Sequence, residues 1–232
     1  MRAQVRTFLS ARTLLAVLCC STALVRSAAA QKTPPAVREA MRGDTLDGTL
    51  VPAGFGKLRQ DDITLRFTLP GGLQIKAIPL DERIIRLLSS DSYRVMVQLK
   101  ESKKRTIDSI ADRTHLQSYS LWYVTFYGVE QGEARFSPQE LIIQNVGRDF
   151  RPIDVLPLTS GFGDYRIKQR QTQSALYVFD GQLDINQPLT AQMENTTAFT
   201  DWQSVLQRAE QERAAIRSRA ASSPKPPPGV RE

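Results

Sequence analysis

The sequence predicts a mainly β fold with appended helices (α+β class), arranged as an antiparallel, Ig-like β-sandwich. Three observations indicate this class. First, about seven or eight short apolar segments are separated by turns rich in Gly and Pro, which is typical of antiparallel sheets. Second, these segments do not alternate regularly with helices, so a parallel α/β sheet is disfavoured. Third, helical patterns are confined to an insert at about 81–113, after the first hairpin, and to a C-terminal helix at about 201–219.

The composition agrees with an ordinary globular protein. Of 232 residues, 41% are hydrophobic and 24% are charged. These proportions support a packed core and exclude a wholly disordered chain. No stretch reaches the roughly 18 consecutive apolar residues that a membrane-spanning helix needs, so we expect no transmembrane span in the mature chain.

The first thirty residues predict a cleaved signal peptide. Basic positions precede a short apolar stretch at 14–20, and three alanines at 28–30 supply a cleavage site. An uncleaved anchor is the weaker alternative, because the apolar stretch is short and Arg26 closes it. We therefore expect export to the periplasm or the exterior. The basic positions are Arg2, Arg6 and Arg12.

Removal of residues 1–30 changes the charge and the chemistry of the chain. It takes away four Arg and no acid, so the net charge falls from +7 to +3, with 27 basic and 24 acidic residues remaining. The basicity is then mostly targeting charge, and we expect no nucleic-acid partner. Cys19 and Cys20 leave too, so the mature chain is predicted to be cysteine-free. Lipidation of either cysteine is not favoured, because Leu18 precedes Cys19.

Residues 31–60 are polar and broken by Pro and Gly, and predict a flexible leader. Order is expected from Ile63, where apolar and polar residues alternate up to Leu69. Pro70-Gly71-Gly72 predicts a turn, and the alternation returns over 73–77. This is the clearest hairpin in the sequence.

The helical insert at about 81–113 divides into two helices. Asp81 caps a short first helix, and the serine-rich segment 89–92 separates it from a longer second one. Strand character resumes at 119–127, where both faces are apolar, which predicts a central strand buried on both sides. Further strands are expected at 141–143, 153–158 and 175–179, and within 183–193.

The C-terminal helix is predicted from apolar residues at helical spacing between Trp202 and Ile216. Residues 220–232 are rich in proline and are expected to form a disordered tail. The predicted organisation is thus a signal peptide (1–30), a leader (31–60), a β-sandwich domain (61–219) and a tail (220–232).

Two segments carry a resemblance to a group of proteins. They are Phe136-Ser137-Pro138-Gln139-Glu140-Leu141-Ile142-Ile143 through Arg151-Pro152, and the run from Gln169 to Phe179. Over about residues 60–210 the chain resembles uncharacterised exported bacterial proteins with an Ig-like sandwich. The resemblance implies this fold and no known activity, so it assigns no functional residue.

The residues with catalytic potential have ordinary structural explanations. His115 is the only histidine, so no multi-histidine metal site exists, and a surface or capping role is favoured. Ser160 lacks the framing glycine of a nucleophile elbow. Five aspartates could supply a hydrolytic pair, but each lies where turns favour Asp. We therefore predict no catalytic residue, metal site or cofactor. The aspartates are Asp149, Asp154, Asp164, Asp180 and Asp184.

One concentration of cations is the candidate binding site, for an anion or for a partner protein. Its members are Arg148, Arg151, Arg166, Lys168 and Arg170. The last three are spaced by two residues, so in a strand they would share one face. A lipid headgroup, a polyanionic glycan or an acidic protein would fit such a stripe. The alternative is a solvated edge strand, where cations discourage aggregation.

These observations predict an exported, non-catalytic binding or assembly module of the bacterial cell envelope. Its partner would be an envelope protein or an anionic envelope component. Two alternatives stay open at this point. One is a carboxylate-dependent hydrolase that acts on an envelope polymer, and the other is a purely structural surface protein with the proline-rich tail as a spacer.

Overall fold

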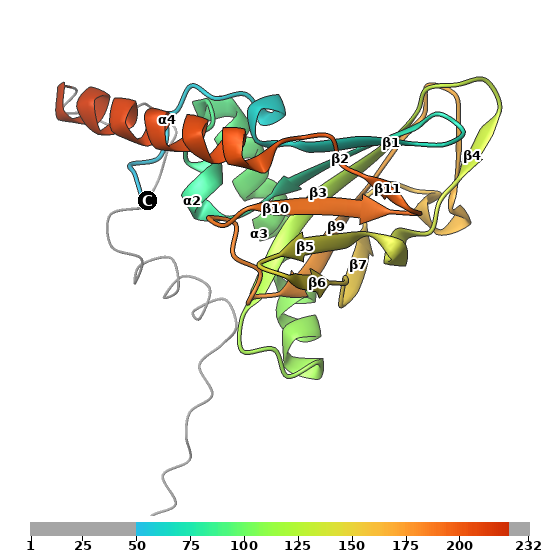
Figure 1. Cartoon of the computed structure of the whole chain (residues 1–232). Coiled ribbons are helices and arrows are strands. Elements are labelled where there is room, and N and C mark those ends of the chain that lie inside the picture. The colour runs from blue at the N-terminus through green and yellow to red at the C-terminus, as the bar shows by residue number, and fades with distance from the viewer. Residues whose placement is uncertain (1–49, 223–232) are drawn as a thin grey trace, which may run out of the picture. The chain divides into compact units, whose positions relative to one another are not determined.

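The computed structural model describes residues 50–222, and these residues form antiparallel sheets with a few helices (Figure 1). The mainly β, α+β class predicted from the sequence is therefore confirmed. The predicted signal peptide, with Cys19 and Cys20, lies outside the described residues, as do 31–49 of the leader and 223–232 of the tail.

The larger sheet has five strands in the order β1-β2-β3-β9-β7, each antiparallel to its neighbours. Apolar side chains alternate along β1, and the predicted turn at Pro70-Gly71-Gly72 joins β1 to β2. As predicted, β3 is central and buried on both faces over most of its length. The strands are β1 (Leu65–Leu69), β2 (Leu73–Pro79), β3 (Tyr119–Gly128), β9 (Thr172–Asp180) and β7 (Asp154–Pro157).

The second sheet has four strands in the order β11-β10-β5-β6, and a separate two-stranded ribbon pairs β4 with β8. Inward side chains of both larger sheets belong to one hydrophobic cluster. The strands are β11 (Thr196–Thr197), β10 (Leu189–Met193), β5 (Ile142–Asn145), β6 (Arg148–Phe150), β4 (Glu133–Arg135) and β8 (Arg166–Lys168). The finer Ig-like arrangement stays a prediction.

The helical insert consists of α2 (Glu82–Ile85) and α3 (Ser90–Arg113), as the sequence predicts. Asp81 caps α2 by accepting a hydrogen bond from the Arg83 backbone N–H. Beyond the C-terminus of α3, His115 adopts a positive φ of 55°, and the Leu116 N–H donates to the carbonyl of Ala111. This is a Schellman cap, so His115 has the capping role that the sequence favoured.

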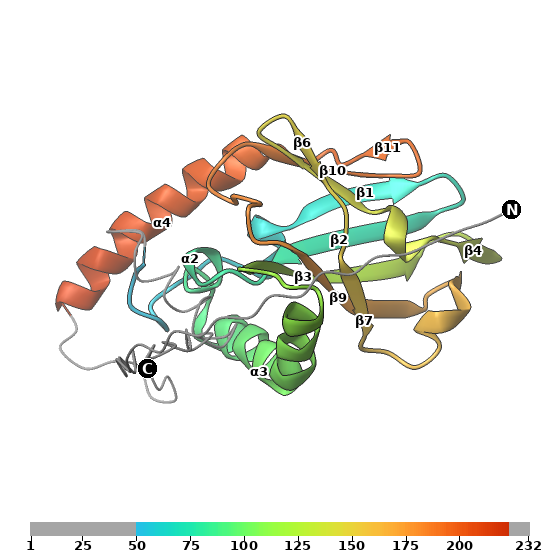
Figure 2. The same cartoon turned by 90° about the horizontal axis from the view of Figure 1, so that it is seen from below.

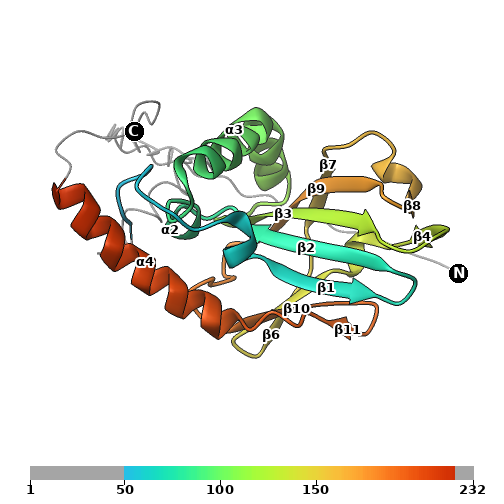
Figure 3. The same cartoon turned by 90° about the horizontal axis from the view of Figure 1, so that it is seen from above.

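The C-terminal helix is α4 (Trp202–Ser222), and it ends three residues beyond its predicted limit, inside the expected tail. It is anchored at its start by Trp202, whose indole N–H donates to the Ile185 carbonyl at 2.9 Å. In Figures 2 and 3, α2, α3 and α4 lie at one end of the five-stranded sheet and β4 lies at the other. Short 3₁₀ turns are η1 (Gln60–Ile63), η2 (Pro138–Glu140) and η3 (Phe162–Asp164).

The packed body begins before Ile63, so the predicted leader is too long at its C-terminal end. Val51 is buried in the core, and parallel bridges join Gly56 to Ser89 and Leu58 to Leu88. A Cβ on Gly56 would lie 2.2 Å from the Leu87 carbonyl oxygen, so only glycine permits this approach. The contacts are with residues distant in sequence, which local Gly and Pro content does not reveal. No helix within residues 50–222 is long and apolar enough to cross a membrane.

Candidate functional site

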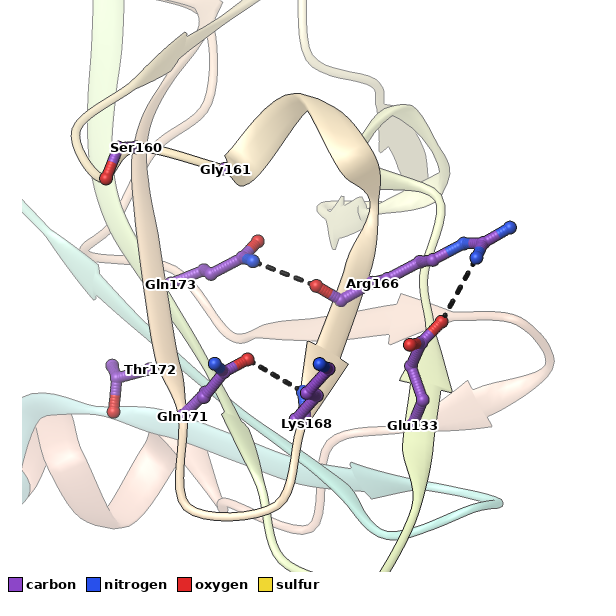
Figure 4. Close-up of a pocket in the computed structure, with 8 residues that line it drawn as sticks. All are labelled: Glu133, Ser160, Gly161, Arg166, Lys168, Gln171, Thr172 and Gln173. Carbon is purple, nitrogen blue, oxygen red and sulfur yellow. Dashed lines mark hydrogen bonds and ion pairs between the residues drawn. The ribbon is translucent and has the colours of Figure 1, made fainter.

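A pocket lined mostly by polar and charged residues lies where β8 turns into β9. It has a volume of about 670 Å³ and opens between the two strands. The strands diverge here because β8 pairs with β4 on its other side, whereas β9 pairs with β3. The pocket is lined by Glu133, Ser160, Gly161, Arg166, Lys168, Gln171, Thr172 and Gln173 (Figure 4).

Two glutamine side chains, one from the β8–β9 turn and one from the start of β9, hydrogen-bond to the backbone of β8. The Gln173 Nε2 donates to the Arg166 carbonyl at 2.9 Å, and the Gln171 Oε1 accepts from the Lys168 backbone N–H at 2.9 Å (Figure 4). These contacts fix the distance between β8 and the start of β9. A ligand that enters meets polar groups which are already in position.

The turn between the strands fixes the base of the pocket. Arg170 has a positive φ of 63°, and its N–H donates to the Gly128 carbonyl at 2.8 Å. A Cβ at Gly128 would lie 2.4 Å from the Lys168 carbonyl oxygen, so glycine is needed for this close approach. The end of β3 thus holds the β8–β9 turn in place.

Aromatic packing supports the pocket from the core. The rings of Phe126 and Phe136 stack with centroids 4.4 Å apart, and Phe162 contacts both at 5.9 and 5.6 Å. Phe136 follows β4 and Phe162 follows Gly161. These contacts attach the ribbon and the Ser160–Gly161 loop to the central strand β3.

The exposed face of the β4–β8 ribbon carries three cations and one acid. Glu133 lies opposite Lys168, and Arg135 lies directly opposite Arg166. Between them Ile167 is buried, so the charged side chains share the outer face. Like charges in directly opposed positions destabilise a strand pair. Because three cations face one acid, the ribbon has excess positive charge, which an anion would neutralise.

Among residues 50–222, a single ion pair offsets this charge. The Arg166 Nη1 lies 3.4 Å from the Glu133 Oε1, and both side chains are substantially exposed. Such a pair contributes at most about 1 kcal/mol, so a ligand can replace it at little cost. Within residues 50–222, neither Arg135 nor Lys168 has an acidic partner within ion-pair distance.

The structure separates the five predicted cations into two groups. Arg166 and Lys168 line the pocket, and Arg170 lies in the adjoining turn rather than on the strand, because β8 ends at Lys168. The predicted three-cation strand face is therefore wrong for Arg170. Arg148 and Arg151 lie in and just after β6, which Figure 3 shows well apart from β8.

Two of the residues with catalytic potential are not brought together. Ser160 lines the pocket, whereas His115 caps α3 and is not among the lining residues. No group of three or more His, Cys, Asp and Glu side chains that could hold a metal occurs in the part of the chain that the structure describes.

The predicted aspartates have structural contacts. Asp154 pairs with Arg113 at 2.9 Å. Asp180 accepts from the Gln182 N–H, and Asp184 accepts from the Asn186 N–H. Asp149 lies in β6 and lines a second pocket, of about 640 Å³, beside the β5–β6 turn. The side chain of Asp164 lies outside the described part of the structure.

Sequence reasoning missed Glu133, Arg135 and Gln173. Glu133 and Arg135 belong to a three-residue strand in a polar segment, which has no periodicity to detect. Gln173 lies at the start of an apolar strand, where its polar contact depends on the path of β8. An excess of Arg and Lys around 166–170 was the only available signal.

Comparisons of the chain with protein-family models, with curated proteins and with solved structures found no match. The functional argument therefore depends on the geometry and charge of the pocket.

Proposed function

We propose that this protein is an exported, non-catalytic binding module of the bacterial cell envelope, and that it binds an anionic envelope component in the β8–β9 pocket. The observation that carries the proposal is the charge of the ribbon beside that pocket. Three cations share one exposed face with a single acid, in a register that opposes Arg135 to Arg166. An anionic group would satisfy this face, and proteins place cations together in this way to bind anions.

Export is supported by the sequence of residues 1–30. Its basic start, short apolar stretch and alanines at 28–30 fit a cleaved signal peptide. The test is expression of the full chain in a Gram-negative host, followed by fractionation and N-terminal mass analysis. We expect a periplasmic product that begins at Gln31. A full-length product in the cytosol would contradict this part of the proposal.

We also infer that the two larger sheets are the layers of an Ig-like sandwich. The support is that their inward side chains form one hydrophobic cluster. A crystal structure in which the sheets do not face each other would contradict this inference.

The binding proposal is tested by removing charge from the ribbon. Arg166→Gln with Lys168→Gln should weaken binding to anionic probes about tenfold or more at low salt, with an unchanged Tm. The matched control is Arg148→Gln with Arg151→Gln, which removes the same charge from the β6 region. Three probes are used: polygalacturonate, polyglutamate, and vesicles of phosphatidylcholine and phosphatidylglycerol in equal parts.

The control pair should bind as the unchanged protein does, within about twofold. Equal losses in the two double variants would mean that net charge alone governs binding, and the pocket would not be the site. Absence of binding to all three probes at low salt would overturn the proposal.

A further inference from the structure

The pocket contains a buried hydrogen-bond acceptor without a donor. Gln173 is only 8% exposed, and its Oε1 has no hydrogen-bond partner among residues 50–222. Its amide orientation is fixed by chemistry, because the Arg166 carbonyl can only accept and therefore requires the Nε2. A buried acceptor without a donor destabilises the protein, because it has lost its hydrogen bonds to water and gained none in exchange. Because the Oε1 is itself closed to solvent, a small shift of the Gln173 amide would let a ligand hydroxyl donate to it, and that hydrogen bond would remove the penalty.

The ligand must therefore carry two kinds of group. The cations of the ribbon require an anion, which accepts hydrogen bonds, and Gln173 requires a donor. The carboxylates of an acidic peptide only accept, and its donors are backbone N–H groups, which in a glutamate are separated from the carboxylate carbon by three carbon atoms. A uronic acid, or another acidic sugar, has ring hydroxyls that donate within a few ångströms of its carboxylate. The two requirements are met by a single sugar unit.

The rest of the pocket agrees with a sugar. Its volume of about 670 Å³ lies within the range of small-molecule sites. Ser160 and Thr172 add hydroxyl groups, which can both donate and accept. A flat bilayer surface could reach the exposed cations but not the buried Oε1 of Gln173, so the pocket favours a soluble or polymeric sugar over a lipid headgroup.

We propose that the pocket binds an acidic saccharide unit, with its anionic group at Arg166 and Lys168 and a hydroxyl that donates to the Gln173 Oε1. This inference rests on the proposed function, because it names the class of anion that the module binds. It also assigns Gln173 as the residue that distinguishes an acidic sugar from other anions.

The first test uses the unchanged full chain and the same three anionic probes, compared by calorimetry at one low salt concentration. We expect polygalacturonate to bind about tenfold more tightly than polyglutamate of matched length, since one hydrogen bond of about 1.4 kcal/mol corresponds to that ratio. Polygalacturonate with methylated hydroxyls keeps its carboxylates but has no hydroxyl donors. It should bind no more tightly than polyglutamate.

The second test removes the acceptor. Gln173→Met should abolish the preference for polygalacturonate while charge-driven binding to polyglutamate persists. The matched control is Gln169→Met, since Gln169 is an exposed glutamine of the same turn that does not line the pocket. The control should keep the preference. If Gln173→Met fails to fold, the methylated polymer still decides, because that comparison uses the unchanged protein.

The outcomes separate this inference from the proposed function. Equal affinity for the two polymers, both weakened by Arg166→Gln with Lys168→Gln, would overturn the saccharide inference and leave anion binding intact. Preferential binding to the vesicles would overturn it in favour of a membrane surface. Absence of binding to every probe would overturn both proposals.

Discussion

The two ends of the five-stranded sheet use positive charge in opposite ways. At the helical end, Arg83 is 10% exposed and forms a two-point ion pair with Asp81, at 2.6 and 2.8 Å, with Asp184 nearby at 3.6 Å. Arg213 of α4 is buried, pairs with Glu210 and donates to the Arg83 carbonyl at 3.0 Å. These cations connect α4 to the start of the helical insert.

At the ribbon end the cations are exposed and outnumber the acids. Arg166 is 54% exposed, and its partner Glu133 is the only acid opposite three cations on the ribbon. The difference indicates that the charge of Arg83 and Arg213 contributes to folding, whereas the charge of the ribbon contributes little to it. Charge that does not stabilise the fold is available for a ligand.

The largest expected effect is at the helical end. Arg83→Met should lower the free energy of unfolding by about 2 kcal/mol, because it removes both bonds to Asp81 and leaves a partly buried carboxylate without its cation. Lys168→Met, the matched change on the ribbon, should stay within about 0.5 kcal/mol. Urea denaturation of both variants measures this. Equal costs would remove the distinction between the two ends.

A smaller effect is expected at Asp61, which lies in η1 just before β1. Burial alone would raise the pKa of Asp61, but the hydrogen bond from Lys76 and the charges of Arg66, Lys76 and Arg59 outweigh it and lower the pKa. The ionised carboxylate therefore stabilises the fold at neutral pH, and this contribution is lost as the pH falls through the lowered pKa. Since Asp61 is substantially exposed, Asp61→Asn should cost under about 1 kcal/mol at pH 7.

The pH dependence of that cost checks its origin. The unfolding free energies of Asp61→Asn and the unchanged protein should converge as the pH falls below 3.8, the usual value for aspartate. A difference that persists at lower pH would mean that the substitution acts through packing rather than charge.

The smallest expected effect has the opposite sign. Arg135→Thr should raise the free energy of unfolding by a few tenths of a kcal/mol, roughly the cost of like charges in opposed positions. It should also weaken binding to polygalacturonate. Arg135→Lys keeps the charge and should leave both quantities nearly unchanged. A loss of stability in Arg135→Thr would indicate that this arginine has a structural role.

The sequence predicts best where one periodicity decides the structure. The alternation from Ile63 to Ala77 fixes the first hairpin, and two apolar faces place 119–127 in the centre of a sheet. Asp81 and the spacing after it define the helical insert. In each case the local pattern and the tertiary contacts favour the same structure.

The site was less predictable, because it depends on which strands pair. Strand order places β6 and β8 in different sheets. This order separates the β6 cations Arg148 and Arg151 from the pocket cations Arg166 and Lys168, and local sequence patterns do not reveal it. The pocket exists because β8 pairs with β4 rather than with β9. The unpaired oxygen of Gln173 can be recognised only after both pairings are known.

The central claim is that the ribbon end of the sheet holds a site for an acidic sugar. The most direct measurement is an NMR titration of the ¹⁵N-labelled full chain with short galacturonate oligomers, which reports the amides that shift on binding. The account predicts shifts confined to Glu133, to Ser160 and Gly161, and to the β8–β9 segment 166–173. Shifts centred on β6 or on α4, or no saturable shifts at all, would contradict it.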